Sequence, residues 1–272
     1  MENELKYVNS HIQINKALQK QFSFKKGENY NDYVYILNLK NNKIEEKDIT
    51  ILNTEYAYYE PEIEEKLGRI IESPFFNLLN NKIFNLYNKY IDKQNIIITE
   101  KEAQCIYHFF ECSQLRGNVI YFFNIKIYND IELKKKKNDS LREYLDNIDN
   151  NKFRLFNDYY LCIGINNTTA NFVIPSNVIY SLKEDDNKYP KYYLPVNDKT
   201  ILIMIHKDDL NSNWFIDNNE KTYSSINEYT QPEIIRFLNK FALINEQNTN
   251  NNFIIGNKEE LKYLNKVIGN GK

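Results

Sequence analysis

Four residues of this sequence carry side chains suited to cutting a phosphodiester: His11, Glu64, Glu72 and Arg116. An imidazole serves as a general base or a metal ligand, and carboxylates bind hard divalent cations. A guanidinium grips a phosphate or a carboxylate through paired hydrogen bonds. Together these residues would suit a metal-dependent nuclease or phosphodiesterase that uses Mg²⁺ or Mn²⁺.

The same residues also have structural interpretations. His11 could cap the first predicted helix, and Glu64 belongs to an acidic group at the start of another helix, where a carboxylate is favoured. Glu72 could form a surface pair with Arg69. Arg116 ends a predicted helix and could satisfy its carbonyl groups. For Arg116 the structural and the phosphate-binding interpretation both stay open.

Cys105, His108 and Cys112 would share one face of a predicted helix, because His108 and Cys112 follow Cys105 by three and seven residues. Thiolate and imidazole ligands suit zinc. The neighbouring Ile106 and Phe109 are apolar, however, and a buried cysteine also packs as a small hydrophobic residue. We favour packing, and from the residues alone we predict no cofactor.

A carboxylate pair followed by lysine, Asp130, Glu132 and Lys134, is typical of metal-dependent nucleases when it follows a strand. Such a spacing is also common by chance in a chain rich in Lys and Glu. The run of lysines that begins there is Lys134, Lys135, Lys136 and Lys137. We interpret it as a solvated loop within a polar segment, residues 132–140, that could contact RNA, DNA or another partner.

Composition excludes several classes of protein. The net charge of −2 gives no general attraction to nucleic acid. No Gly-x-Ser-x-Gly motif and no dinucleotide-binding fingerprint occur. No apolar run is long enough for a membrane helix, and the first residues do not resemble a signal peptide. With three cysteines, an odd number, we expect a cytoplasmic protein without a disulfide framework.

The first half of the chain predicts a hairpin and then helices. Residues 33–39 and 43–51 predict two strands joined by a turn at Asn41-Asn42. We further predict a short helix or helical turn within residues 11–24, and a helix from Glu62 that kinks or restarts at Ser73-Pro74 and then continues. Capping boxes of Thr99 with Glu102 and of Ser140 with Glu143 predict a helix from Thr99 to Arg116 and another from Ser140 to about Ile148.

After residue 150 the pattern changes to strands. We predict strands at residues 159–165, 172–174, 178–182 and 192–205, a helix from Thr230 to Leu243, a strand at 253–255 and a last helix capped by Asn257. Turn residues Asn197-Asp198 divide the longest run. Residues 119–128 suit a helix or a strand equally.

These elements predict an α+β protein with an N-terminal hairpin, a helical middle and a mostly antiparallel C-terminal sheet with flanking helices. We expect one domain over residues 1–272, with 1–150 and 151–272 as an alternative subdivision.

Several segments occur in an order known from one family. They are Asn9-Ser10-His11 with Leu18 and Phe22, then Tyr58-Tyr59, the helix ending in Gln114-Leu115-Arg116, and the run from Phe172 to Val178. From about residue 9 to 265 this order resembles the bacterial and fungal domain-of-unknown-function family four-two-three-eight. In that family a proline follows the first histidine by three positions, where this chain has Ile14. A later Thr-Ser-Asp-x-Pro motif has Asn177 in place of the aspartate. The resemblance implies a shared shape and a member that has lost any shared catalytic role.

We therefore favour a protein that works by binding a protein or ribonucleoprotein. Its excess of Asn, Lys, Ile and Tyr indicates an A/T-rich genome, such as that of a mobile element. A phage-borne inhibitor of a bacterial nucleoprotein defence complex would fit. The alternative is the metal-dependent nuclease or phosphodiesterase, within a defence or toxin system.

Overall fold

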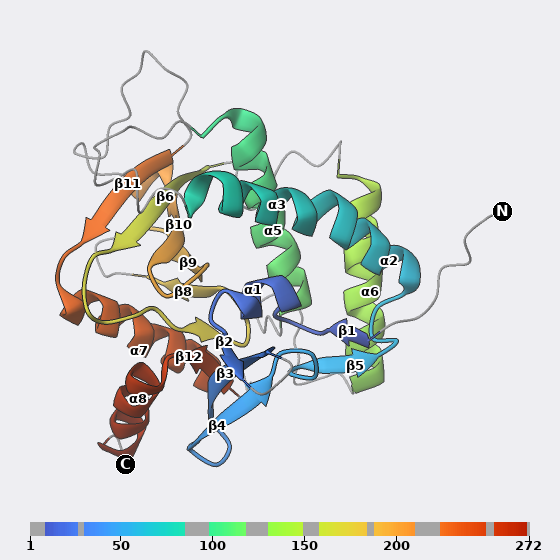
Figure 1. The fold of residues 1–272 in the computed structure, drawn as a ribbon. Coiled ribbons are helices and arrows are strands. Elements are labelled where there is room, and N and C mark those ends of the chain that lie inside the picture. Colours follow the sequence, from blue (N-terminus) through green and yellow to red (C-terminus); the bar gives the residue numbers. More distant parts are fainter. Residues whose placement is uncertain are drawn as a thin grey trace.

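A computed structural model describes residues 9–26, 30–84, 98–117, 130–148, 158–183, 188–209, 224–248 and 253–270. Helices and sheets are both extensive, and the order of elements confirms the predicted α+β class (Figure 1). The ambiguous segment 119–128 lies outside the described residues.

The C-terminal sheet has five strands in the order β11-β6-β10-β9-β8. Their bounds are β6 Tyr159–Asn166, β8 Tyr180–Leu182, β9 Lys191–Pro195, β10 Thr200–His206 and β11 Ser224–Tyr229. All neighbours are antiparallel except β11 and β6, which run parallel. The mostly antiparallel sheet is confirmed. The sequence pattern does not reveal β11, because Ile226 and Tyr229 are its only apolar residues.

Both faces of this sheet are covered, which explains the unbroken apolar run of β10. Leu202 and Met204 belong to a core shared with the helical middle of the chain. Ile201 and Ile203 point the other way, into a core shared with α7 (Pro232–Asn248). The sheet thus separates α7 from helices α3 and α5 (Figure 1).

The N-terminal hairpin is confirmed and belongs to a larger sheet. Its strands are β3 (Asn31–Asn38) and β4 (Lys43–Asp48), joined at the predicted turn. The sheet is completed by β2 (Phe24–Lys26), β7 (Ile174–Pro175) and β12 (Phe253–Gly256). Because β12 pairs with β3, the last strand of the chain lies beside the hairpin.

A two-stranded ribbon carries His11. It consists of β1 (Asn9–His11) and β5 (Thr54–Tyr56), which are antiparallel. The following helix, α1 (Lys16–Lys20), lies within the range predicted for a short helix or helical turn. The side chain of Asn15 caps it by accepting a hydrogen bond from the Leu18 amide at 2.8 Å.

At Ser73-Pro74, where the sequence predicts a kink or a restart, the helix does not restart. One helix runs through α2 (Pro61–Lys66), η1 (Leu67–Glu72), α3 (Ser73–Leu78) and η2 (Leu79–Ile83), where η1 and η2 are π-helical turns. Ser73 has helical backbone angles, and its amide donates to the carbonyl of Gly68, five residues earlier. A proline inside a helix lacks an amide donor and crowds the preceding turn. The wider π turn before Pro74 accommodates it without a break.

Helix α5 (Glu100–Arg116) confirms its predicted bounds and the capping box of Thr99 with Glu102. Helix α6 (Asp130–Asp146) overturns two predictions, because it includes Ser140 in its interior and the polar segment 132–140. Its buried residues are Lys137, Asn138, Leu141 and Leu145. They form one helical face, which the lysine-rich sequence conceals.

Helices α7 and α8 (Lys258–Asn270) follow the C-terminal sheet. Helix α7 extends past its predicted end at Leu243. The predicted cap of α8 is confirmed, because the Glu260 amide donates to the side chain of Asn257 at 2.8 Å. Within the described ranges, no helix is long and apolar enough to cross a membrane.

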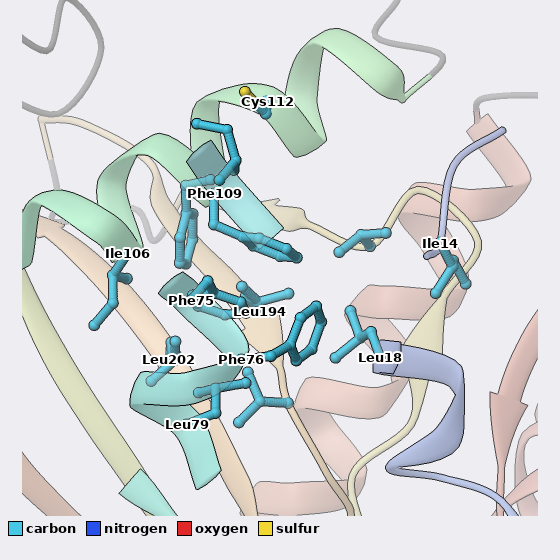
Figure 2. Packing of buried hydrophobic residues seen from close by; sticks show 14 of the residues in the cluster. Ile14, Leu18, Phe75, Phe76, Leu79, Ile106, Phe109, Cys112, Leu194 and Leu202 are labelled. Carbon is cyan, nitrogen blue, oxygen red and sulfur yellow. The ribbon is translucent and has the colours of Figure 1, made fainter. Parts of the chain in front are cut away.

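The larger core lies between the helical middle and the C-terminal sheet. Phe75 of α3 and Phe109 of α5 stack with ring centres 3.7 Å apart. Around them lie Leu18 from α1 and Leu202 from β10 (Figure 2). Elements from both halves of the chain therefore meet in this core and hold β1, η1 and the end of α5 together.

Candidate functional site

Arg116 lies buried at the end of α5, and two of its side-chain nitrogens donate hydrogen bonds to other residues of the chain. Nη1 donates to Oε1 of Glu72 in η1, and Nη2 donates to the backbone carbonyl oxygen of His11 in β1. The guanidinium carbon lies 5.3 Å from the centre of the Tyr59 ring. This guanidinium therefore joins three separate elements through charge-assisted hydrogen bonds and a cation–π contact.

His11 meets Arg116 with its backbone carbonyl, and its imidazole lies near the Leu52 backbone. Burial, together with the nearby Arg116 guanidinium, lowers the pKa of His11 to about 4. The ring is therefore uncharged at neutral pH. It can exchange a proton or bind a metal, but it does not attract a phosphate by charge.

Three polar atoms of this cluster are buried without a hydrogen-bond partner: Nδ1 of His11, Oε1 of Glu64 and Nε of Arg116. Glu64 also interacts electrostatically with Arg116. The fold thus brings together all four residues singled out for phosphoryl chemistry. Buried polar groups nearly always have partners, so unpaired ones often mark bound water or a ligand.

Glu72 pairs with Arg116, and the expected surface pair with Arg69 is not among the ion pairs of the described residues. The side chains of Glu72 and Arg116 are 25% and 7% exposed. A carboxylate held by a guanidinium in this way is a poor metal ligand. Among the described residues, no group of three or more His, Cys, Asp or Glu side chains is placed to hold a metal ion.

The cysteines of α5 fit apolar packing. Cys112 is buried in the larger core (Figure 2), and burial raises the pKa of its thiol well above its ordinary value. Burial also raises the pKa of the Cys105 thiol. Nδ1 of His108 lies 2.5 Å from the hydroxyl of Tyr144 on α6. Burial therefore favours the protonated thiol in both residues, and Cys112 packs as a small hydrophobic residue.

The expected basic loop is instead part of α6, and Lys137 is fully buried. Its Nζ donates to the backbone carbonyl oxygen of Arg116 at 2.8 Å. Burial and the Arg116 charge lower the pKa of Lys137 to about 7. Lys137 therefore cannot belong to a surface that contacts nucleic acid.

The other lysines of the run point in different directions, because successive residues of a helix are rotated by about 100°. Lys134 pairs with Glu55 at 3.2 Å and lies 5.3 Å from the centre of the Tyr58 ring. Lys135 is exposed and Lys136 is half-buried. The run therefore does not form the solvated loop that the sequence predicts.

Asp130 and Glu132 lie exposed in the first turn of α6. They begin a helix, where carboxylates are favoured by the helix dipole. In the nuclease pattern, by contrast, such residues follow a strand, and residues 118–129 lie outside the described residues.

Sequence reasoning missed an exposed apolar stripe on α7. Ile234, Phe237 and Ile244 are 38%, 50% and 45% exposed. Phe241 is half-buried, with its ring centre 4.7 Å from that of Phe237. We call these four residues the α7 stripe. Its intervals of three, four and three residues follow the repeat of a helix-packing seam. That spacing is the signal that could have revealed it.

No protein-family model, no curated protein and no solved structure matches this chain significantly.

The segment Ser176-Asn177 is hydrogen-bonded to α7. The Asn177 amide and the Ser176 hydroxyl each donate to the buried carboxylate of Glu246 at 2.7 Å. This segment therefore has a structural partner in the chain.

Proposed function

We propose that this protein acts by binding another protein, and that the α7 stripe is the surface on which the partner docks. The stripe is the observation that carries this proposal. A partner would cover three large apolar side chains that now face solvent on one helix. Contiguous exposed apolar residues are typical of protein-binding surfaces.

Charge on α7 favours a protein partner over a nucleic acid. Over residues 232–247 of this helix, the exposed residues are Glu233, Ile234, Phe237, Ile244 and Gln247, of which Glu233 alone is charged. Protein interfaces are rich in aromatic residues and poor in charge at their centre, whereas nucleic-acid surfaces need lysine and arginine. The burial of Lys137 removes support for a basic contact elsewhere on α6.

The finer proposal is a cytoplasmic, phage-borne inhibitor that binds a bacterial defence complex. The A/T-rich composition supports a mobile element as the source, and the loss of the aspartate at Asn177 supports a binding role over a catalytic one.

Affinity capture tests the binding proposal. A tagged chain is expressed in candidate hosts beside an untagged copy, and the captured proteins are identified by mass spectrometry. Wild type should recover a protein that Phe237→Asp loses. Ile131→Asp is the matched control, because Ile131 is 81% exposed on a different helix. Equal capture by Phe237→Asp and wild type would rule out the α7 stripe.

The unpaired atoms of His11, Glu64 and Arg116 favour one second candidate, a metal-dependent phosphodiesterase. It predicts cleavage of RNA or DNA with Mg²⁺ or Mn²⁺. Glu64→Gln should abolish that cleavage with little effect on folding, because Oε1 of Glu64 has no hydrogen bond to lose. Glu72→Gln should abolish it as well, because Glu72 holds the Arg116 guanidinium in place. A wild-type protein that cleaves neither substrate with either metal excludes this candidate.

A further inference from the structure

The α7 stripe is a palindrome. From either end its residues follow the order Ile, Phe, Phe, Ile, at intervals of three, four and three. At about 100° per residue, these four side chains fall within about 80° of the helix circumference. A surface with this symmetry matches itself when a second copy is turned by a half rotation, which is the requirement of an isologous dimer.

We infer that the partner on the α7 stripe is a second copy of this chain, with the two α7 helices antiparallel about a two-fold axis at the level of Asn239. This inference rests on the proposed protein-binding function of the same surface. Ile234 of each copy lies against Ile244 of the other, and Phe237 lies against Phe241. Each contact occurs twice, as closed two-fold symmetry demands.

The rings are already arranged for such packing. Phe237 and Phe241 of one chain meet at an interplanar angle of 64°. Aromatic side chains gain from this edge-to-face arrangement in addition to the area they bury. Because both rings are on one helix, little further ordering is needed when a second pair packs against them.

Two flanking pairs of this register bring no like charges together. In this register Gln231 lies opposite Gln247, and Glu233 lies opposite Asn245. The positive residues are turned aside within their own chain. The Arg236 guanidinium carbon and Lys240 Nζ lie 5.2 Å and 5.7 Å from the centre of the Tyr263 ring on α8. The residues on either side of the α7 stripe therefore allow a second copy to bind, and they give little attraction to a strongly charged partner.

The α7 stripe lies on a single helix, so the surface that two copies can bury is small, and this limits the affinity of the dimer. Permanent dimers bury much larger surfaces than a single helix pair provides. The expected dimer is therefore reversible, with a dissociation constant on the order of micromolar. Dilution should separate it.

Sedimentation velocity from low to high micromolar concentration tests the inference on the full chain. Wild type should shift from monomer to dimer. Ile234→Lys should weaken the dimer by about tenfold or more, because a lysine then faces Ile244. Ile244→Glu should weaken it similarly. Both positions are partly exposed, and circular dichroism checks that each variant folds.

The double variant Ile234→Lys/Ile244→Glu gives the decisive result. In the antiparallel register each new lysine faces a new glutamate of the other copy, so dimerisation should return. In a parallel pair, or in a complex with another protein, the two changes add and binding stays lost. Ile131→Lys is the control and should dimerise like wild type.

Other results separate this inference from the proposed function. If wild type stays monomeric at every concentration, or if the double variant does not recover, a second copy on the α7 stripe is excluded. If the monomer still captures a host protein that Phe237→Asp loses, protein binding through α7 stands with a different partner. A monomer that captures nothing excludes both.

Discussion

Lys137 on α6 donates a hydrogen bond from Nζ to the backbone carbonyl oxygen of Arg116, the last residue of α5. The last carbonyl groups of a helix lack partners within it, so this bond satisfies one of them in the interior. It also brings the lysine near the Arg116 guanidinium, which disfavours the charged lysine. The bond connects α6 to the cluster that contains His11, Glu72 and Arg116.

The pKa of Lys137 predicts a rise of stability with pH. Its pKa falls from 10.5 to about 7 in the folded protein, so between these values the unfolded chain binds a proton that the folded chain does not. The free energy of unfolding should therefore increase as pH rises through this window. Urea unfolding at several pH values should show a smaller increase for Lys137→Met than for wild type.

Lys135→Met is the control for that series, because Lys135 is exposed on the same helix. It should follow the wild-type dependence on pH. Parallel curves for wild type and Lys137→Met would mean that Lys137 is not buried as described.

His11 predicts a loss of stability in acid. Its pKa falls from 6.5 to about 4 on folding, so between these values only the unfolded chain carries a proton on this ring. The free energy of unfolding should decrease as pH falls from about 6.5 to about 4. His11→Gln lacks this contribution and should lose less stability over the same range in urea unfolding. An equal loss in both proteins would contradict the burial of His11.

Arg116 is expected to contribute to folding through its ion pair. Arg116→Met would leave the Glu72 carboxylate and the His11 carbonyl without a donor. Breaking such a pair from one side costs about 3–5 kcal/mol in stability. Arg69→Met, at an exposed position of η1, should change stability by less than about 0.5 kcal/mol. A similar small effect of both changes in urea unfolding would refute the role of the Arg116 cluster.

Glu246 predicts the opposite dependence on pH from His11. Burial raises its pKa from 4.5 to about 7, so between these values the folded chain keeps a proton that the unfolded chain releases. The free energy of unfolding should fall as pH rises through this window. Glu246→Gln should flatten that fall, and the exposed Glu233→Gln should not. A fall that Glu246→Gln leaves unchanged would show that the carboxylate is not desolvated.

The elements that sequence predicts best have a local physical signal. The capping box of Thr99 with Glu102 locates α5 because both partners lie within one turn. The hairpin of β3 and β4 follows from a turn between two runs of strand formers. The four residues of the candidate site were also named from the sequence, but their contacts were not. Arg116 donates a hydrogen bond to the backbone carbonyl of His11, and the spacing of these two residues in the sequence does not predict that contact.

The misplaced elements depend on contacts between distant segments. The lysine-rich sequence of α6 resembles that of a loop. In the structure, Lys134 instead packs over the Tyr58 ring and Lys137 donates a hydrogen bond to the Arg116 carbonyl. In the sequence Pro74 suggests a helix start, but in the structure a π turn before it lets the helix continue. The parallel strand β11 has too few apolar residues to be recognised alone, and it forms against the buried strand β6.

The central claim, that a protein docks on the α7 stripe, is tested most directly by photocrosslinking in living cells. A photoreactive phenylalanine analogue replaces Phe237 in one strain and Ile131 in another, and both positions are exposed. The account predicts a discrete covalent protein adduct from position 237 and none from position 131. Absence of an adduct at 237, or the same adducts from both positions, would contradict it.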